Sequence, residues 1–288
     1  MSDTNDVREK SHWGWGWADR FPTAEQRRER GQQAKMLLGF APERVDEPVP
    51  LSAVTLPAPR VQPPAALAAI SDTTVGARVR HTHGRNFPDI LRGFRGDFAG
   101  APDVVAFPND EADVTRVLDW ASAADVVVVP YGGGTSVVGG ISAGGEQPFV
   151  SLDLSRLDRL LEVDTVSRSA RIQAGASGPR LEAQLAEHDL TLRFFPQSFE
   201  FATLGGWIAT RAGGHFAMGP THIDDLVEST RTVTPRGVLE TRRLPGSGAG
   251  PSADRLILGS EGTLGVITEA WMRVRPKPTQ RSTATSRT

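Results

Sequence analysis

The feature that most constrains this chain is an apolar strand that runs directly into a glycine-rich loop. Residues 126–140 read Val-Val-Val-Val-Pro-Tyr-Gly-Gly-Gly-Thr-Ser-Val-Val-Gly-Gly. Because Gly132–Gly134 lack Cβ atoms, their amides can approach a ligand closely, and successive amides in such a loop form an anion-binding nest. Thr135 and Ser136 add hydroxyl donors, so the loop is suited to neutralise a pyrophosphate without a lysine. This pattern indicates a dinucleotide ligand.

Two better-known phosphate loops do not fit these residues. The loop of nucleoside triphosphatases needs Gly-Lys-Ser/Thr at its end, whereas Gly139 is followed by Gly140 and Ile141. The nicotinamide-binding turn needs a third glycine where Val137 stands. The expected phosphate site is therefore of another kind.

Composition limits the classes of protein and partner. The chain has 288 residues, of which 39% are hydrophobic, enough for one large or two modest domains with a core. Its formal net charge of -2 provides no overall basic field for nucleic acid, so any phosphate site must be local. The absence of cysteine excludes disulfides, thiolate metal ligation and a cysteinyl link to a cofactor. We expect a cytoplasmic protein without a membrane span; peripheral lipid contact and the oligomeric state stay open.

The distribution of residue types divides the chain into three parts. Residues 1–97 are predicted to be an N-terminal arm and linker, because a charged helical segment (Ala24 to Leu38) is followed by a proline-rich run. Residues 98–278 are predicted to form the main domain, and residues 279–288 a disordered tail.

Within the main domain, we expect an α+β fold. A helix after the capping residue Asp110 leads into the strand 126–129, which is an αβ step. The rest is mostly antiparallel, with helices near 179–188 and 204–211. The remaining expected strands and hairpins are 149–153, 160–164, 169–174, 192–195, the hairpin 226–234 with 238–243, and a second hairpin over 265–274.

Three further segments offer exposed backbone to a ligand. Phe195 to Trp207 places small and hydroxyl residues before a Gly-Gly helix start, where free amides and the positive helix end are expected to meet a second anionic or carbonyl group. Thr210 to Gly214 closes that helix with another turn. Gly259 to Thr268 contains three glycines just before a strand, a loop whose backbone can lie against a flat ring.

In this order and at these intervals, the four segments resemble the FAD-binding domain of the vanillyl-alcohol oxidase (PCMH-type) superfamily. Within that superfamily they resemble the alkyl-dihydroxyacetonephosphate synthase family, as do Trp13 to Trp17 in the arm and His81 to Gly84. The resemblance implies two subdomains, a small αβ one and a mostly antiparallel one with helices, with FAD between them. The residues that it implies for FAD binding are Pro130, Tyr131, Gly132, Gly133, Gly134, Thr135, Ser136, Gln197, Ser198, Phe199, Glu200, Phe201, Ala202, Thr203, Thr210, Arg211, Ala212, Gly213, Glu261, Gly262, Thr263, Leu264, Gly265, Val266 and Ile267.

The resemblance also bears on how FAD is held. Superfamily members that attach FAD through histidine often carry that histidine beside the first-loop glycines, where this chain has Thr135. We therefore expect noncovalent FAD.

The resemblance implies ether-lipid synthesis, in which the fatty acid of an acylated dihydroxyacetone phosphate is replaced by a long-chain alcohol. The substrate domain of the family, which carries the substrate-binding and catalytic residues, would follow residue 278 and is absent from this chain. We therefore assign no catalytic residue and expect no turnover without that domain or a second polypeptide that carries it. Two alternatives stay open: an FAD-dependent dehydrogenase of 2-hydroxy acids such as D-lactate or glycolate, and a noncatalytic flavin-binding module.

Two histidines raise the question of a metal. His81 and His83 have a spacing that can ligate a metal ion on a strand, but no carboxylate or third histidine is clustered beside them in the sequence. We interpret them as part of a polar turn and predict no metal site.

Overall fold

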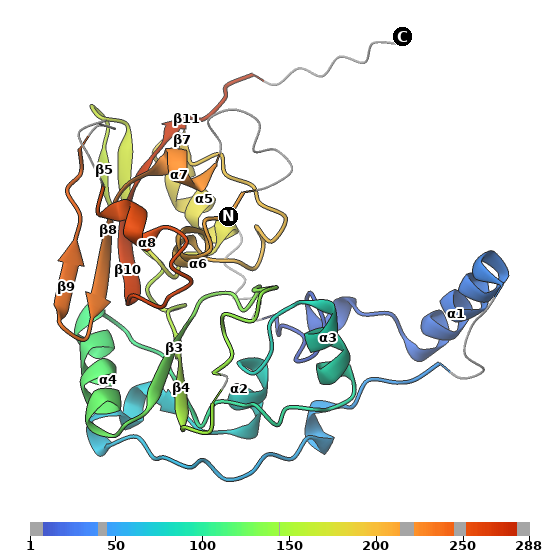
Figure 1. Ribbon diagram of the computed structural model, residues 1–288. Coiled ribbons are helices and arrows are strands. Elements are labelled where there is room, and N and C mark those ends of the chain that lie inside the picture. Colours follow the sequence, from blue (N-terminus) through green and yellow to red (C-terminus); the bar gives the residue numbers. More distant parts are fainter. Residues whose placement is uncertain (1–7, 40–44, 144, 214–221, 245–251, 281–288) are drawn as a thin grey trace.

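The computed structural model describes residues 8–39, 45–143, 145–213, 222–244 and 252–280. Two sheets form two subdomains, one below the other in Figure 1, and helix α1 (Ala24–Leu38) projects to one side. The expected helix at α1 is confirmed, because Thr23 and Gln26 form a capping box at its start. Most of the predicted tail, residues 281–288, lies outside the described residues.

The first subdomain, in the lower half of Figure 1, is built on a four-stranded sheet of order β1-β2-β4-β3. Strands β2, β4 and β3 are parallel, and β1 pairs antiparallel with β2. Its main helix begins after Asp110, whose side chain accepts a hydrogen bond from the amide of Asp113, so the predicted cap is confirmed. The elements are β1 (Ser71–Asp72), β2 (Val104–Ala106), α4 (Glu111–Ala123), β3 (Val127–Tyr131) and β4 (Phe149–Asp153).

Part of the segment predicted as arm and linker contributes to this subdomain. It supplies β1, which pairs with β2, and two short helices whose starts are capped by Thr74 and Asn86. The proline-rich run also packs, since Val54 is buried with Val79 and Phe98 in a small cluster. Short elements of this kind leave little periodicity in a sequence. They are α2 (Val75–Arg80), α3 (Phe87–Phe94) and the 3₁₀ helices η1 (Ala18–Arg20), η2 (Leu51–Ala53) and η3 (Ala65–Ile70).

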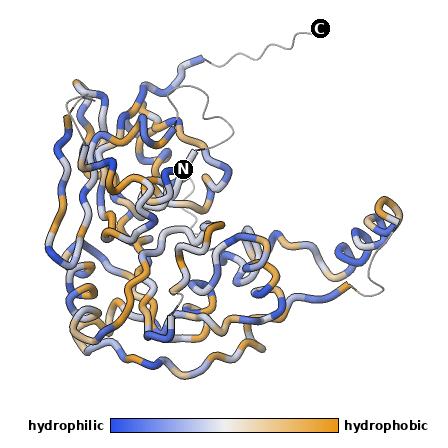
Figure 2. Tube along the Cα trace, viewed as in Figure 1, coloured by the Kyte–Doolittle hydropathy of each residue, from blue (hydrophilic) through white to orange (hydrophobic). Residues whose placement is uncertain are grey.

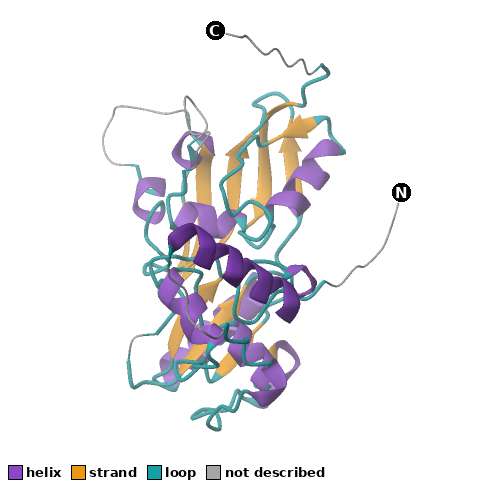
Figure 3. Cartoon of the chain, turned by 90° about the vertical axis from the view of Figure 1, so that its right-hand side faces the viewer, coloured by secondary structure: helices purple, strands orange, loops and turns teal. Residues whose placement is uncertain are grey.

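The second subdomain contains a five-stranded sheet of order β5-β6-β10-β8-β9, antiparallel throughout. Helices cover one face of this sheet, as the side view in Figure 3 shows. The combination of a small αβ part with an antiparallel part confirms the predicted α+β fold of two subdomains. The elements are β5 (Leu160–Asp164), β6 (Ser169–Gln173), α5 (Gly178–Ala186), β7 (Leu190–Thr191), α6 (Leu204–Ala209), α7 (Ile223–Leu226), β8 (Val227–Thr234), β9 (Gly237–Glu240), α8 (Asp254–Ile257), β10 (Val266–Arg273) and β11 (Arg275–Pro276).

Two predicted elements are wrong. The segment 265–274 is no hairpin: β10 is one strand that pairs with β6 on one side and with β8 on the other. The segment 192–195 is no strand. Arg193 has a positive φ of 56°, and the amides of Leu192 and Arg193 donate to Glu182 Oε1, each at 3.1 Å. Leu192 and Phe194 are buried on either side of Arg193, and this alternation resembles that of a strand. The amides of the segment nevertheless pair with a side chain.

The two subdomains share a core and a charged contact. Val233 of β8 and Val266 of β10 belong to the same buried cluster as α4 and the parallel strands, which are largely orange in Figure 2. At the edge of this cluster, Glu111 accepts two hydrogen bonds from Arg231, from Nε and Nη2, each at 2.8 Å. Thr268 Oγ1 donates to the same carboxylate at 2.9 Å. A bidentate pair of this geometry fixes α4 against the second sheet.

We expect Glu111→Gln to lower the free energy of unfolding by about 1–3 kcal/mol, because it removes the bidentate charged acceptor of Arg231 and leaves that guanidinium with Glu240 alone. The hydrogen bond from Arg231 holds the pKa of Glu111 below its ordinary value of 4.5. The contribution of the carboxylate is therefore complete above pH 4.5 and is lost as pH falls through the lowered, folded-state pKa. Urea unfolding at a series of pH values measures this contribution. The difference in free energy of unfolding between wild type and Glu111→Gln should disappear in acid. Glu187→Gln, at the exposed end of α5, serves as the control.

Candidate functional site

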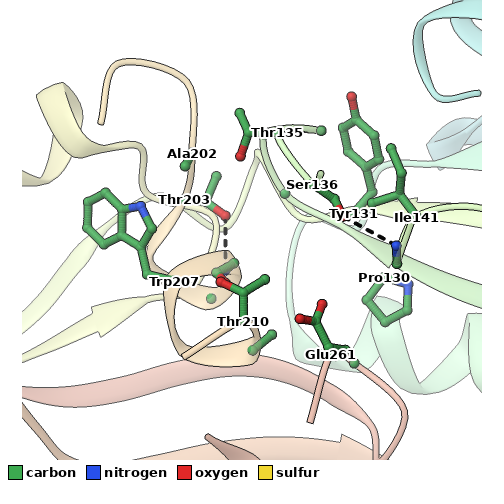
Figure 4. A pocket seen from close by; sticks show the side chains of 18 of the residues that line it. Pro130, Tyr131, Thr135, Ser136, Ile141, Ala202, Thr203, Trp207, Thr210 and Glu261 are labelled. Atoms are coloured by element: carbon green, nitrogen blue, oxygen red, sulfur yellow. Dashed lines mark hydrogen bonds between the residues drawn. The ribbon is translucent and has the colours of Figure 1, made fainter. Parts of the chain in front are cut away.

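A cavity of about 320 Å³ lies between the two subdomains, where β3 ends. Its walls come from residues 130–141 of the first subdomain and from residues 198–212 and 261–267 of the second, as Figure 4 shows. The volume lies at the lower end of the range of ligand sites, about 300–1,000 Å³. A site beyond the carboxyl end of a parallel strand is also where ligands bind in open α/β sheets. The cavity is therefore the candidate site of this chain.

The structure brings most of the predicted cofactor residues to this cavity. All seven residues of the first loop, Pro130 to Ser136, line it. The others that line it are Ser198, Ala202, Thr203, Thr210, Ala212, Glu261, Gly262, Gly265 and Ile267.

Other predicted residues lie next to the cavity without lining it. Two neighbours in the second segment have other contacts: Phe199 packs against Trp207, and Glu200 accepts a hydrogen bond from the indole of Trp17 at 2.6 Å. The full set outside the cavity wall is Gln197, Phe199, Glu200, Phe201, Arg211, Gly213, Thr263, Leu264 and Val266.

The cavity also has walls that the sequence did not assign to the site. Four of these residues follow the first loop directly, and the helix α6 supplies most of the others. Extending the prediction along the glycine-rich run to residue 141 and into the Gly-Gly helix would have found them, whereas Leu154 has no local signal. The residues are Val137, Val138, Gly140, Ile141, Leu154, Gly205, Gly206, Trp207 and Ala209.

The glycines of the first loop serve two purposes. Within the described residues, the amides of 132–136 donate no hydrogen bond, so they are free to meet a ligand. The loop also packs closely against the second subdomain: a Cβ on Gly133 would lie 1.9 Å from the carbonyl oxygen of Phe201, and one on Gly132 would lie 2.3 Å from Thr203 Oγ1. Only glycine permits this approach.

The start of α6 does not offer the free amides that were predicted for the Gly-Gly pair. Leu204 and Gly205 donate to the carbonyls of Ala176 and Ala174, and the amide of Gly206 is turned to Thr203 Oγ1 at 3.4 Å. The helix end is thus used to join the loop after β6, and the expectation that its amides are free for a ligand is wrong.

Glu261 is the charged side chain among the residues that line the cavity. Its backbone has a positive φ of 54°, and its amide donates to the carbonyl of Ala209 at 2.8 Å, which fixes the loop that contains Glu261 to the end of α6. Burial raises the pKa of this carboxyl. The described residues of the wall include no lysine or arginine, so backbone amides and hydroxyl groups are the groups that would contact an anionic ligand.

Two further groups from the sequence have structural contacts. Arg211, which the resemblance implies for FAD binding, instead forms a surface ion pair with Asp224 at 2.6 Å. His81 is buried and contacts the carbonyl of Ala77 at 2.7 Å and Asp153 Oδ2 at 2.8 Å. Among the described residues, no group of histidine, aspartate or glutamate side chains could hold a metal ion.

No helix in the described part of the chain is both long and apolar enough to cross a bilayer.

Comparison with known proteins points to one cofactor. A family model described as an FAD-binding domain matches residues 102–242. Alkyldihydroxyacetonephosphate synthase of Dictyostelium discoideum is 44% identical over 70% of this chain and 33% of its own length; that of Trypanosoma brucei brucei is 36% identical with the same coverage. The mitochondrial D-lactate dehydrogenase (cytochrome) of Arabidopsis thaliana is 37% identical over 62% of this chain and 31% of its own length.

A solved structure shows the same arrangement. A structure of an alkyldihydroxyacetonephosphate synthase superposes with a TM-score of 0.76 at 37% identity, and covers 82% of this chain and 44% of that chain. This chain spans about a third of the length of the curated relatives. The cavity between the subdomains, the four matching loops and these likenesses agree, and the chain belongs to the PCMH-type, vanillyl-alcohol oxidase superfamily, with residues 102–242 as its FAD-binding domain.

Proposed function

We propose that this chain binds FAD noncovalently in the cavity between its subdomains. The observation that carries the proposal is the first loop, whose amides at 132–136 have no acceptor within the described residues and line the cavity. Such a nest suits a pyrophosphate, and the hydroxyl groups of Thr135 and Ser136 extend it. The residues present therefore fit the cofactor.

The other walls suit the rest of the cofactor. The segment around Ala209 to Ala212 and the glycine loop 261–265 expose backbone and small side chains, against which a flat ring can pack. When bound, FAD supplies the reactive flavin ring, and the protein binds and orients it. A noncovalent link is supported by the composition of the wall, since the described residues that line the cavity include no histidine and the chain has no cysteine.

We expect the purified chain with added FAD to show the flavin absorption bands after removal of free cofactor. Denaturation in acid should then release all of the yellow colour into the supernatant, since nothing tethers it. The measurement is an absorption spectrum of the pellet and of the supernatant. A colourless chain with no affinity for FAD at micromolar concentration would refute FAD binding, and colour that stays with the pellet would refute the noncovalent link.

At the level of the reaction, we propose a part of an alkyldihydroxyacetonephosphate synthase-type enzyme of ether-lipid synthesis. Such an enzyme exchanges the fatty acid of acylated dihydroxyacetone phosphate for a long-chain alcohol. The support is the likeness to two such synthases over 70% of this chain and the structural likeness at a TM-score of 0.76. The substrate would be bound by a further domain, either in the same polypeptide or in a partner.

A second candidate is an FAD-dependent 2-hydroxy acid dehydrogenase, supported by the likeness to a D-lactate dehydrogenase. The two are separated by joining the chain to the polypeptide encoded directly downstream. Anaerobic bleaching of the bound flavin by D-lactate would favour the dehydrogenase. Release of fatty acid from acylated dihydroxyacetone phosphate, with uptake of an added long-chain alcohol in its place, would favour the synthase. Flavin binding without either reaction would favour a noncatalytic flavin-binding module.

A further inference from the structure

A second, small hollow lies on the other side of the first loop. The arm residue Lys10 and the guanidinium of Arg85 line it together with Gly133 and Thr135. Because Gly133 and Thr135 also line the main cavity, the loop is the wall between the two spaces. The hollow measures about 10 Å³, which is room for about one water molecule. A phosphate cannot enter it.

The arm is folded where it meets this hollow. Lys10 and Trp17 form an antiparallel bridge, and within the turn the amide of Ser11 donates to the carbonyl of Gly16 at 2.9 Å. Trp13 anchors the turn by packing edge-on against Phe94 of α3, with ring centroids 5.1 Å apart. Lys10 is therefore held in place by the structure of the arm.

The same turn contacts both subdomains. On the first, Glu9 forms an ion pair with Arg80 at the end of α2. On the second, the indole of Trp17 donates to Glu200 and lies 5.1 Å from the ring of Phe201. Residues 8–21, defined here as the arm turn, thus join the two halves that form the cavity.

The two cations at the hollow have no carboxylate at ion-pair distance within the described residues. Arg85 donates to the carbonyls of Ser11, His83 and Gly84, and Lys10 Nζ lies 5.9 Å from the centroid of Phe201. Burial lowers the pKa of both groups, and for Lys10 it outweighs the opposing attraction of Asp153. Asp89 likewise attracts Arg85, but neither desolvated charge has a carboxylate in contact in the described part of the chain, and both lie beside a loop that is suited to bind an anion.

We propose that the arm turn is part of the FAD site and that Lys10, with Arg85 beside it, stabilises the pyrophosphate of FAD from behind the glycine loop. This inference rests on the proposed FAD binding. The charges act across the wall that Gly133 and Thr135 form, since the hollow is too small for the phosphates. Lys10 is thereby a binding residue contributed from outside the matched domain, which begins at residue 102.

The test compares FAD affinity in three variants of the full chain. Lys10→Met removes the charge and keeps the length of the side chain; we expect the dissociation constant to rise about tenfold, the size of one partly screened charge interaction. Lys10→Arg should remain within about threefold of wild type. Lys35→Met, on the exposed surface of α1, should leave the affinity unchanged. Quenching of flavin fluorescence on titration measures all of them.

A second readout separates this role from a structural one. Without FAD, Lys10→Met should melt at the same temperature as wild type or above it, because it removes a desolvated, unpaired charge. With FAD, its melting temperature should rise less than that of wild type. Equal FAD affinity in Lys10→Met and wild type would overturn the inference while leaving FAD binding intact, and a lowered melting temperature without FAD would assign Lys10 to folding alone. Failure of the wild type to bind FAD would overturn both proposals.

Discussion

Gly133→Ala is expected to weaken FAD binding at least about 100-fold, equivalent to about 2.7 kcal/mol. The added Cβ would lie 1.9 Å from the carbonyl oxygen of Phe201 and 2.9 Å from Cα of Ala202. Both are backbone atoms, so no side chain can rotate away, and the loop itself must move out of the position in which its amides line the cavity. Titration of the purified variant with FAD, followed by flavin fluorescence, measures the loss.

The matched control is Gly100→Ala, because a Cβ at that glycine meets nothing within 4 Å. Its FAD affinity should stay within about twofold of wild type. Retention of wild-type affinity in Gly133→Ala would show that the close approach to Phe201 does not fix the loop. Urea unfolding of both variants measures the accompanying loss of stability, because overpacking of this kind lowers the free energy of unfolding by about 1–3 kcal/mol. If Gly133→Ala stays folded without FAD, its loss of affinity is due to the displaced loop.

Trp207→Ala is expected to lower the free energy of unfolding by about 3–5 kcal/mol. The indole is 1% exposed, packs edge-on against Phe194 with centroids 5.1 Å apart, and stacks near Phe199 at 6.3 Å. Because Trp207 also lines the cavity, its removal should merge the space left in the core with the ligand site. Chemical unfolding without FAD gives the free energy directly.

The informative comparison is Trp207→Phe. The indole Nε1 is buried without a hydrogen-bond partner in the described part of the chain, so phenylalanine removes a polar group that gains nothing there. We expect this variant to cost less than half of what Trp207→Ala costs. Losses of similar size in the two variants would mean that the indole nitrogen has a role that this geometry does not explain.

Much of the fold follows from local pattern. The predicted strands 149–153 and 160–164 coincide with β4 and β5, because each combines apolar residues with flanking turn residues. The start of α4 was visible in Asp110, and the glycine loop was visible in composition alone. These features depend on residues that are neighbours in the sequence, and for that reason they can be predicted from a single sequence.

The errors come from partners that are distant in sequence. Glu182 of α5 takes the amides of the segment that was predicted as a strand at 192–195, and no local pattern reports such a contact. The amides at the start of α6 are likewise taken by carbonyls of Ala174 and Ala176, about thirty residues earlier. Leu154 reaches the cavity only because β4 lies between β2 and β3. Each of these depends on tertiary arrangement.

The position of β10 has a consequence for biosynthesis. It is the middle strand of its sheet, yet it is the last of the five to be synthesised. Until residue 273 leaves the ribosome, β5 with β6 and β8 with β9 are two separate hairpins whose inner edges lack a partner. The edge of β6 therefore waits for its partner from residue 173 to residue 273, and the second sheet closes only when β10 is made.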